Sequence, residues 1–144
     1  MKTILKYLII VMLLNSYSCL TAQNLKQHQW KHRVVLIFSK TSESTNFKKQ
    51  SQIFSNTTKG FRDRKLIVYE VLPKMYRIKT KKYEWKTSEH LYKNYNNDAF
   101  NFKVVLIGVD GTIKFESFEV VSILTLFNKI DKMSMRQSEM KNKN

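Results

Sequence analysis

The densest group of side chains suited to binding chemistry lies between Lys74 and Lys86. The segment interleaves six basic residues with three aromatic ones: Lys74, Arg77, Lys79, Lys81, Lys82 and Lys86 with Tyr76, Tyr83 and Trp85. Ammonium and guanidinium groups neutralise phosphates or carboxylates, and aromatic rings stack or sit in a lipid interface. The pattern predicts a site for an anionic polymer or a lipid surface. The alternative is a solvated loop whose rings pack on a sheet.

The sequence offers little support for thiol chemistry. The only cysteine, Cys19, lies in a segment built like a secretory signal, with two lysines before an apolar run at residues 7–14 and a small-residue exit that ends at Ala22. We expect cleavage after Ala22, which leaves the mature chain no thiolate for disulfide exchange or peroxide reduction. Lipid attachment at Cys19 is the alternative, although Ser16 stands where a lipoprotein signal has Leu or Val.

Charge narrows the class of partner only weakly. The chain carries 26 Lys and Arg against 11 Asp and Glu, a formal +15, and loss of Lys2 and Lys6 with the signal leaves +13. Lysine and asparagine are abundant and arginine is scarce, as an AT-rich genome produces without selection for any ligand. We therefore do not expect nucleic acid as the partner. An anionic envelope polymer, a lipid surface or another exported protein is expected instead.

Hydroxyl and imidazole groups form no complete catalytic or metal-binding set in the sequence. Ser44 stands where a helix should begin, and without a neighbouring base we expect it to cap that helix rather than act as a nucleophile. His28 and His32 have the i, i+4 spacing of a helical metal pair but lack a third ligand, and His90 should lie in the first turn of a helix. We expect no catalytic residue, no metal and no cofactor.

The stretch that organises the fold is a predicted hairpin over residues 102–117. Residues 104–107 are all apolar, so both faces of this strand should be buried, as at the centre of a sheet. From Thr112 onward apolar and polar residues alternate, which is typical of a strand near an edge. Asp110 and Gly111 would supply the two positive-φ positions of a type I′ turn.

Two further strands and three helices complete the predicted domain. Strands are expected at residues 33–38 and 65–71, and helices at residues 45–57, 88–95 and from 123 onward. Gly60 should end the first helix in a left-handed cap, Thr87 and Ser122 should cap the other two, and residues 74–86 should form a loop. The order β-α-β-α-β-β-α with right-handed crossovers predicts a thioredoxin-like α/β fold, a four-stranded mixed sheet with helices on both faces.

The C-terminal third also carries a family resemblance. Residues 105–114 and, above all, residues 126–140, with their Ile-Asp, Met-x-Met-Arg and Glu-Met groups, resemble the bacterial members of the DUDES-type domain family; residues 30–33 and 60–64 match more weakly. The motif positions are Arg62, Asp63, Arg64, Gly108, Asp110, Gly111, Lys114, Ile130, Asp131, Met133, Met135, Arg136, Glu139 and Met140. Val109 and Ser134 depart from the family, which usually has Lys and Pro there.

The resemblance implies a domain of unknown function, related to peroxiredoxins and thioredoxins, with animal relatives in secreted matrix and sushi-repeat proteins. Thr41-x-x-Ser44 is similar to the peroxiredoxin Thr-x-x-Cys, with a hydroxyl in place of the thiol. In the C-terminal motif, Met133 and Met135 with Arg136 would dock a partner; alternatively the methionines seal the sheet end while Arg136 and Glu139 pair at i, i+3.

These observations predict three segments: a signal at residues 1–22, a thioredoxin-like domain at 23–140 and a basic polar tail at 141–144. The mature protein is expected in the periplasm or outside the cell, as a binding or accessory module without redox cysteines. The alternative is an enzyme of peroxiredoxin-like ancestry that uses a non-thiol group.

Overall fold

A six-stranded mixed sheet forms the centre of the structure, a computed structural model that describes residues 25–79 and 84–142. The strands lie in the order β4-β3-β2-β1-β5-β6. Their bounds are β1 Arg33–Ser39, β2 Leu66–Leu72, β3 Met75–Ile78, β4 Lys86–Thr87, β5 Phe102–Ile107 and β6 Ile113–Ser117. β1 pairs in parallel with β2 and antiparallel with β5.

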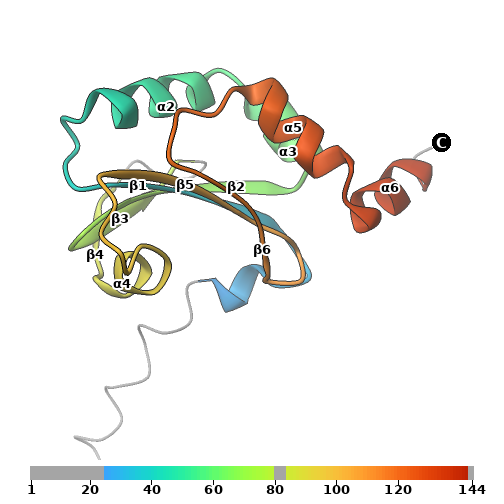
Figure 1. Cartoon of the computed structure of the whole chain (residues 1–144). Helices are drawn as coiled ribbons and strands as arrows, with labels where there is room; N and C mark the ends of the chain where they lie inside the picture. The colour runs from blue at the N-terminus through green and yellow to red at the C-terminus, as the bar shows by residue number, and fades with distance from the viewer. Residues whose placement is uncertain (1–24, 80–83, 143–144) are drawn as a thin grey trace, which may run out of the picture.

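Helices cover both faces of this sheet (Figure 1). The helices are η2 Lys26–His28, α2 Thr45–Ser55, α3 Thr58–Asp63, α4 His90–Tyr95, α5 Ile123–Asp131 and α6 Ser134–Lys141. α2, α3 and α5 lie over one face of the sheet. α4 lies on the other face, and η2 lies at the end of that face. α6 extends beyond the end of the sheet, next to α5. Among the described residues, no helix has both the length and the apolar composition needed to cross a bilayer.

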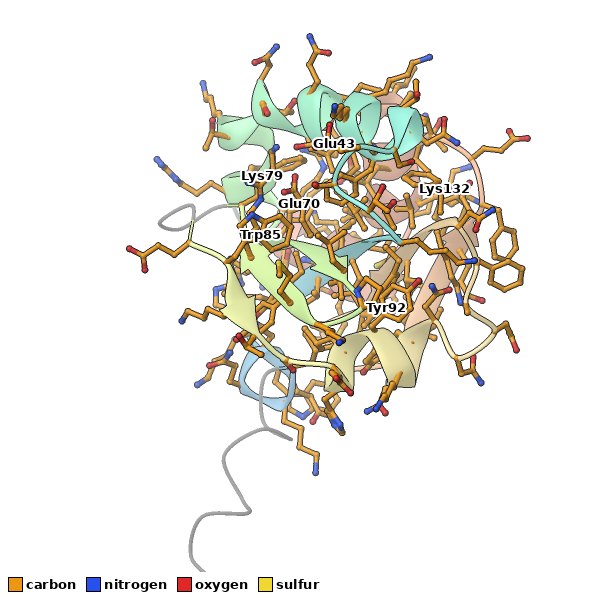
Figure 2. The ribbon with its side chains drawn as sticks, turned by 90° about the vertical axis from the view of Figure 1, so that its left-hand side faces the viewer. Glu43, Glu70, Lys79, Trp85, Tyr92 and Lys132 are labelled. Carbon is orange, nitrogen blue, oxygen red and sulfur yellow. The ribbon has the colours of Figure 1, made fainter. Side chains whose placement is uncertain are left out.

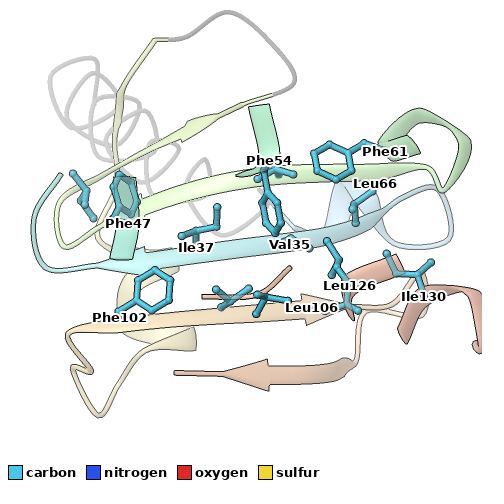
Figure 3. Packing of buried hydrophobic residues seen from close by; sticks show 14 residues of the cluster. Val35, Ile37, Phe47, Phe54, Phe61, Leu66, Phe102, Leu106, Leu126 and Ile130 are labelled. Carbon is cyan, nitrogen blue, oxygen red and sulfur yellow. The ribbon is translucent and has the colours of Figure 1, made fainter. Parts of the chain in front are cut away.

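The core lies on both sides of β1, whose seven residues are all buried. Val35 and Ile37 face α2, α3 and α5, and Figure 3 shows them among Phe47, Phe54, Phe61, Leu126 and Ile130. Val34, Leu36 and Phe38 face the opposite way, toward Leu91 and Tyr92 of α4. Each fully buried side chain of this kind contributes about 1.5–3 kcal/mol. The two apolar layers explain why β1 carries no alternation of polar residues.

The prediction of four strands was wrong, because β3 and β4 form within the segment expected to be a loop. β3 follows a tight connection after β2 and pairs with it antiparallel, Val71 opposite Tyr76. Tyr76 is buried and stacks on Tyr69, with ring centroids 5.7 Å apart. On the other face of β3, Arg77 pairs with a buried carboxylate instead of water. A strand whose inward residues include a cation shows no clear hydrophobic period.

Two helix boundaries also differ from the prediction. The first helix ends at Ser55, and Gly60 lies inside a separate helix, α3, rather than in a cap. A Cβ at Gly60 would lie 2.6 Å from the Phe127 ring, so glycine permits α3 to approach α5 closely. Thr87 belongs to β4, and α4 begins at His90. The predicted Ser122 cap is confirmed, since its Oγ accepts a hydrogen bond from the Thr125 amide at 3.0 Å.

The β5–β6 turn is not type I′, because only Gly111 of the predicted pair has a positive φ, +81°. The Gly111 amide donates to the Gly108 carbonyl and the Gly108 amide to the Thr112 carbonyl, a longer turn closed by a left-handed glycine. Asp110 serves the turn through its side chain, whose Oδ1 accepts from the Thr112 amide at 3.1 Å. Aspartate is favoured at such turns for this side-chain bond as well as for backbone freedom.

Candidate functional site

A groove of about 410 Å³ lies between α2 and the β3–β4 side of the sheet. Its walls include Lys48, Ser51 and Gln52 from α2, Arg77 from β3, Lys79 after it and Trp85 before β4. Figure 2 shows Glu70, Lys79 and Trp85 grouped on the same side of the molecule, below α2 in that view. The groove therefore combines cationic, hydroxyl and aromatic groups from segments far apart in the sequence.

The base of the groove is organised by Glu70 of β2, which is completely buried. Its carboxylate accepts hydrogen bonds from Ser51 Oγ at 2.5 Å, from Lys79 Nζ at 3.3 Å and from Arg77 Nε. Lys79 Nζ also donates to Ser51 Oγ at 2.7 Å. A buried carboxylate is tolerated only with such partners. Here two cations share one carboxylate, so the described charges at the base of the groove sum to a positive value.

Trp85 gives the groove an aromatic wall. The guanidinium carbon of Arg77 lies 4.6 Å from the centroid of the Trp85 ring, a cation–π contact. Arg77 is therefore held from one side by Glu70 and from another by Trp85, while its side chain keeps 21% of its surface exposed. The result is a fixed cation beside an aromatic plane, at the edge of an open groove.

The structure brings together three of the nine predicted binding residues, Arg77, Lys79 and Trp85. Tyr76 is not with them, because alternation along β3 turns its ring to the opposite face of the sheet. Lys79 is turned inward, with a side chain only 6% exposed. Its ammonium group therefore contributes charge to the base of the groove rather than to a solvated loop.

The remaining predicted binding residues are either outside the groove lining or outside the description. Lys74 lies in the connection between β2 and β3, and Lys86 is exposed on β4. Lys81, Lys82 and Tyr83 lie outside the described residues. Binding by the basic and aromatic segment as a whole therefore stays a prediction.

Ser51, whose hydroxyl contacts both Glu70 and Lys79, was not indicated by any sequence pattern. Ser44, the residue singled out from sequence, occupies the N-cap position of α2, but its side chain makes no capping hydrogen bond. Ser51 lies two turns further along the same helix. Its Oγ donates to Glu70, whose charge is already shared by two cations, and accepts from Lys79, so its partners order the groove rather than act as a free base.

A second cluster, at the C-terminal end of α3, contains five of the family-motif residues: Asp63, Arg64, Asp131, Arg136 and Glu139. Arg136 donates to the carboxylates of Asp63 and, at 3.2 Å, Asp131, and Arg64 Nη2 lies 2.5 Å from Asp131 Oδ2. The predicted pair of Arg136 and Glu139 is present at 3.5 Å. Arg136 is only 3% exposed, so this network fastens α6 to the end of α3. A functional role for these positions stays a prediction.

Glu139 is the carboxylate of this cluster with the most cationic neighbours. Its Oε2 lies 3.2 Å from Arg33 Nη1, and Lys65 and Arg136 are within 3.6 Å. Partial burial acts to raise the pKa of Glu139, but the hydrogen bond and charge of Arg33, with the charges of Lys65 and Arg136, lower it below its ordinary value.

The histidines serve packing in this structure. His28 Nε2 lies 2.7 Å from the Tyr69 hydroxyl, and the His28 and His32 rings meet edge to face. His90 begins α4, as predicted. Across residues 25–79 and 84–142, no group of three or more His, Cys, Asp or Glu side chains is arranged to hold a metal ion.

The topology defines the class of protein. The parallel β1–β2 pair, the antiparallel β5–β6 hairpin beside β1 and the helices on both faces make this a thioredoxin-like α/β domain. The reduced 2-Cys peroxiredoxin of Plasmodium vivax shares the fold: its TM-score is 0.58 at 15% identity, over 79% of this chain and 72% of the peroxiredoxin chain. The model of the family "Domain of unknown function (DUF4174)" matches residues 24–139, so the chain belongs to that family. No curated protein matches the sequence.

Proposed function

We propose that this domain is an exported thioredoxin-like binding module, without redox cysteines, that holds an anionic polymer of the cell envelope in the groove between α2 and β3. The observation that carries the proposal is the sharing of buried Glu70 by Arg77 and Lys79 next to the Trp85 ring. Export is supported by the signal-like composition of residues 1–22, and kinship with the DUDES-type family by the ending at residues 126–140.

The arrangement suits a negatively charged ligand for two reasons. Arg77 is already fixed by Glu70 and Trp85, so its binding to an anion would lose little side-chain entropy. Among the described residues, Lys48 on the α2 wall pairs with Glu43, which is itself largely exposed, so Lys48 can turn to a ligand at little cost. A groove of about 410 Å³ accommodates a short segment of a chain, such as one or two acidic sugars.

The test is calorimetric titration of the chain from residue 23 onward with an oligogalacturonate, at several salt concentrations. The double variant Lys48→Gln with Arg77→Gln should weaken binding and flatten the dependence of log K on log salt by roughly one to two units. Trp85→Ala should weaken binding at every salt concentration, because stacking is screened much less than charge.

The matched control is the double variant Lys49→Gln with Lys59→Gln, which removes the same charge from exposed positions outside the groove lining. Equal losses from the two double variants would mean that the net positive charge acts only as a diffuse field, and would contradict the groove as the site. Vesicles of phosphatidylglycerol, titrated in parallel, distinguish a lipid surface from a polymer.

Activity assays distinguish the binding module from the enzyme alternative. Peroxide reduction and insulin reduction by the chain from residue 23 should remain at background, because that chain contains no thiol. Turnover by metal-free protein that disappears in Ser51→Ala or Ser44→Ala would support a hydroxyl-dependent enzyme instead.

A further inference from the structure

Arg33, at the start of β1, is a completely buried guanidinium whose hydrogen bonds are only partly made. Its Nη1 donates to the Arg64 carbonyl at 3.0 Å and to Glu139 Oε2 at 3.2 Å. Its Nε and Nη2 have no hydrogen-bond partner in the part of the chain that the structure describes. A buried charged donor without an acceptor is costly, so an acceptor that completes this site would bind with a favourable contribution.

The cluster around Arg33 is also one negative charge short. Arg33, Arg64, Lys65 and Arg136 are the four cations, and Asp63, Asp131 and Glu139 are the three carboxylates that pair with them in the described residues. Glu139 is shared by Arg33, Lys65 and Arg136. One further anion would therefore balance the cluster without displacing any pair that is already formed.

A cavity of about 240 Å³ lies against Arg33. One wall is the β5–β6 turn with Lys114, and the other is the start of α6, with Met133, Ser134 and Met135. The first amides of a helix have no carbonyl partner within it, and in α6 the first helical bond runs from the Gln137 amide to the Met133 carbonyl. Within the described part of the chain, the Ser134 and Met135 amides therefore have no helical acceptor, and both residues line the cavity at the helix end that favours negative charge.

We propose that this cavity binds one compact oxyanion, a carboxylate or phosphate group, between Arg33, Lys114 and the N-terminus of α6. The cavity volume fits a single such group, either free or at the end of a larger molecule. Asp110 also lines the cavity, and its Oδ2 is paired with Lys114 Nζ at 2.7 Å, so the pair presents little net repulsion to an incoming anion.

The test is the thermal unfolding midpoint of the chain from residue 23, with ionic strength held constant by sodium chloride. Inorganic phosphate and N-acetylglycine are the two probes. The expected result is a rise of several degrees with at least one of them, since a ligand that binds only the folded state stabilises it. A response to phosphate alone identifies the phosphate group, and a response to N-acetylglycine alone identifies the carboxylate. No rise with either probe overturns the proposal.

Three variants locate the binding. Arg33→Lys keeps the charge but removes Nε and Nη2, and should lower probe affinity by at least about tenfold. Lys114→Gln lies on exposed β6, leaves Asp110 uncompensated in the cavity wall, and should lower affinity severalfold even if Arg33→Lys does not fold.

Lys59→Gln, the charge-matched control, should bind the probes as the parent does. Unchanged affinity in Lys114→Gln, or an equal loss in Lys59→Gln, overturns the site. The double variant Lys48→Gln with Arg77→Gln should leave probe binding intact, which separates this cavity from the groove.

Discussion

At the residue scale, the carboxylates of Glu70 and Glu139 are each surrounded by more cations than one carboxylate can neutralise. Glu70 could be noticed in the sequence as the one charged residue in the apolar stretch Leu66–Leu72, which implies a buried partner. Its partners could not be predicted, because Ser51 and Lys79 reach it only through the packing of α2 over β2 and the pairing of β3.

Removal of the Glu70 charge tests whether this carboxylate is the buried counter-charge of Arg77 and Lys79. Glu70→Gln should lower the free energy of unfolding by about 3–5 kcal/mol, because it leaves Arg77 and Lys79 without their buried counter-charge. Denaturant unfolding monitored by circular dichroism measures the change. The control is Glu119→Gln, an exposed carboxylate, which should change stability by no more than about 0.5 kcal/mol. A similar small change at Glu70 would contradict the structural role assigned to it.

Tyr69 gives a prediction for alkaline pH. Burial, with a smaller contribution from Tyr76, raises the pKa of Tyr69 to about 12. Because the folded-state pKa lies above the unfolded value near 10, the contribution of Tyr69 to folding stability is fully present below pH 10 and is lost between about pH 10 and about 12, by up to about 1.4 kcal/mol per pH unit. The difference in absorbance at 295 nm between the parent and Tyr69→Phe should titrate near pH 12. A midpoint near 10 would show that Tyr69 is solvated.

At the element scale, the predictions were right for the strands with long apolar runs and wrong where an inward charge or a contact with a distant residue decides the structure. β1 and β5 contain the apolar runs 34–38 and 104–107, and each forms a fully buried strand where it was expected. β3 was missed because its inward-facing positions include the partly buried Arg77, and the α2–α3 break was missed because Gly60 suggested a helix end. The ring of Phe127, 67 residues later, leaves no room for a side chain at Gly60, and no local pattern contains this contact.

Gly60→Ala should therefore destabilise the fold, although replacing glycine by alanine inside a helix usually stabilises it. Alanine in a helix interior is normally more favourable than glycine by about 1 kcal/mol. Here the new Cβ would lie 2.6 Å from the Phe127 ring, which Arg64 and Phe61 hold in place, so we expect a loss of about 1–3 kcal/mol. Combining Gly60→Ala with Phe127→Leu should recover part of the loss in thermal unfolding. A stabilised single variant would show that α3 and α5 can move apart.

At the scale of the whole molecule, the class of fold followed from the order of strands and helices, whereas the two candidate sites did not. The groove joins α2, β2 and β3, and the Arg33 cluster joins β1, α3, α5 and α6, so both depend on segments that meet only in the folded chain. The sequence indicated Arg77, Lys79 and Trp85 of the groove and the motif residues of the cluster, but not Lys48 or Ser51. It did not indicate that Lys79 is buried or that Arg33 belongs with the motif.

The remaining prediction concerns residues 1–22, which lie outside the described residues. Expression with the full sequence in a Gram-negative host should yield an exported protein that begins at Gln23, because a basic start, an apolar run and a small-residue exit form a signal. Intact mass of the exported chain gives the result. A chain that begins at Cys19 and carries lipid would replace the soluble module with a membrane-anchored one.

The central position of β1 has a consequence for the newly made chain. β1 ends at Ser39, its parallel partner begins at Leu66 and its antiparallel partner begins at Phe102. Until those later segments are available, a strand that is apolar on both faces has two open edges, the kind of template on which chains aggregate. Residues 33–39 are therefore where a chaperone has the most reason to hold the unfolded chain, and where a charged substitution would slow aggregation at the expense of the native sheet.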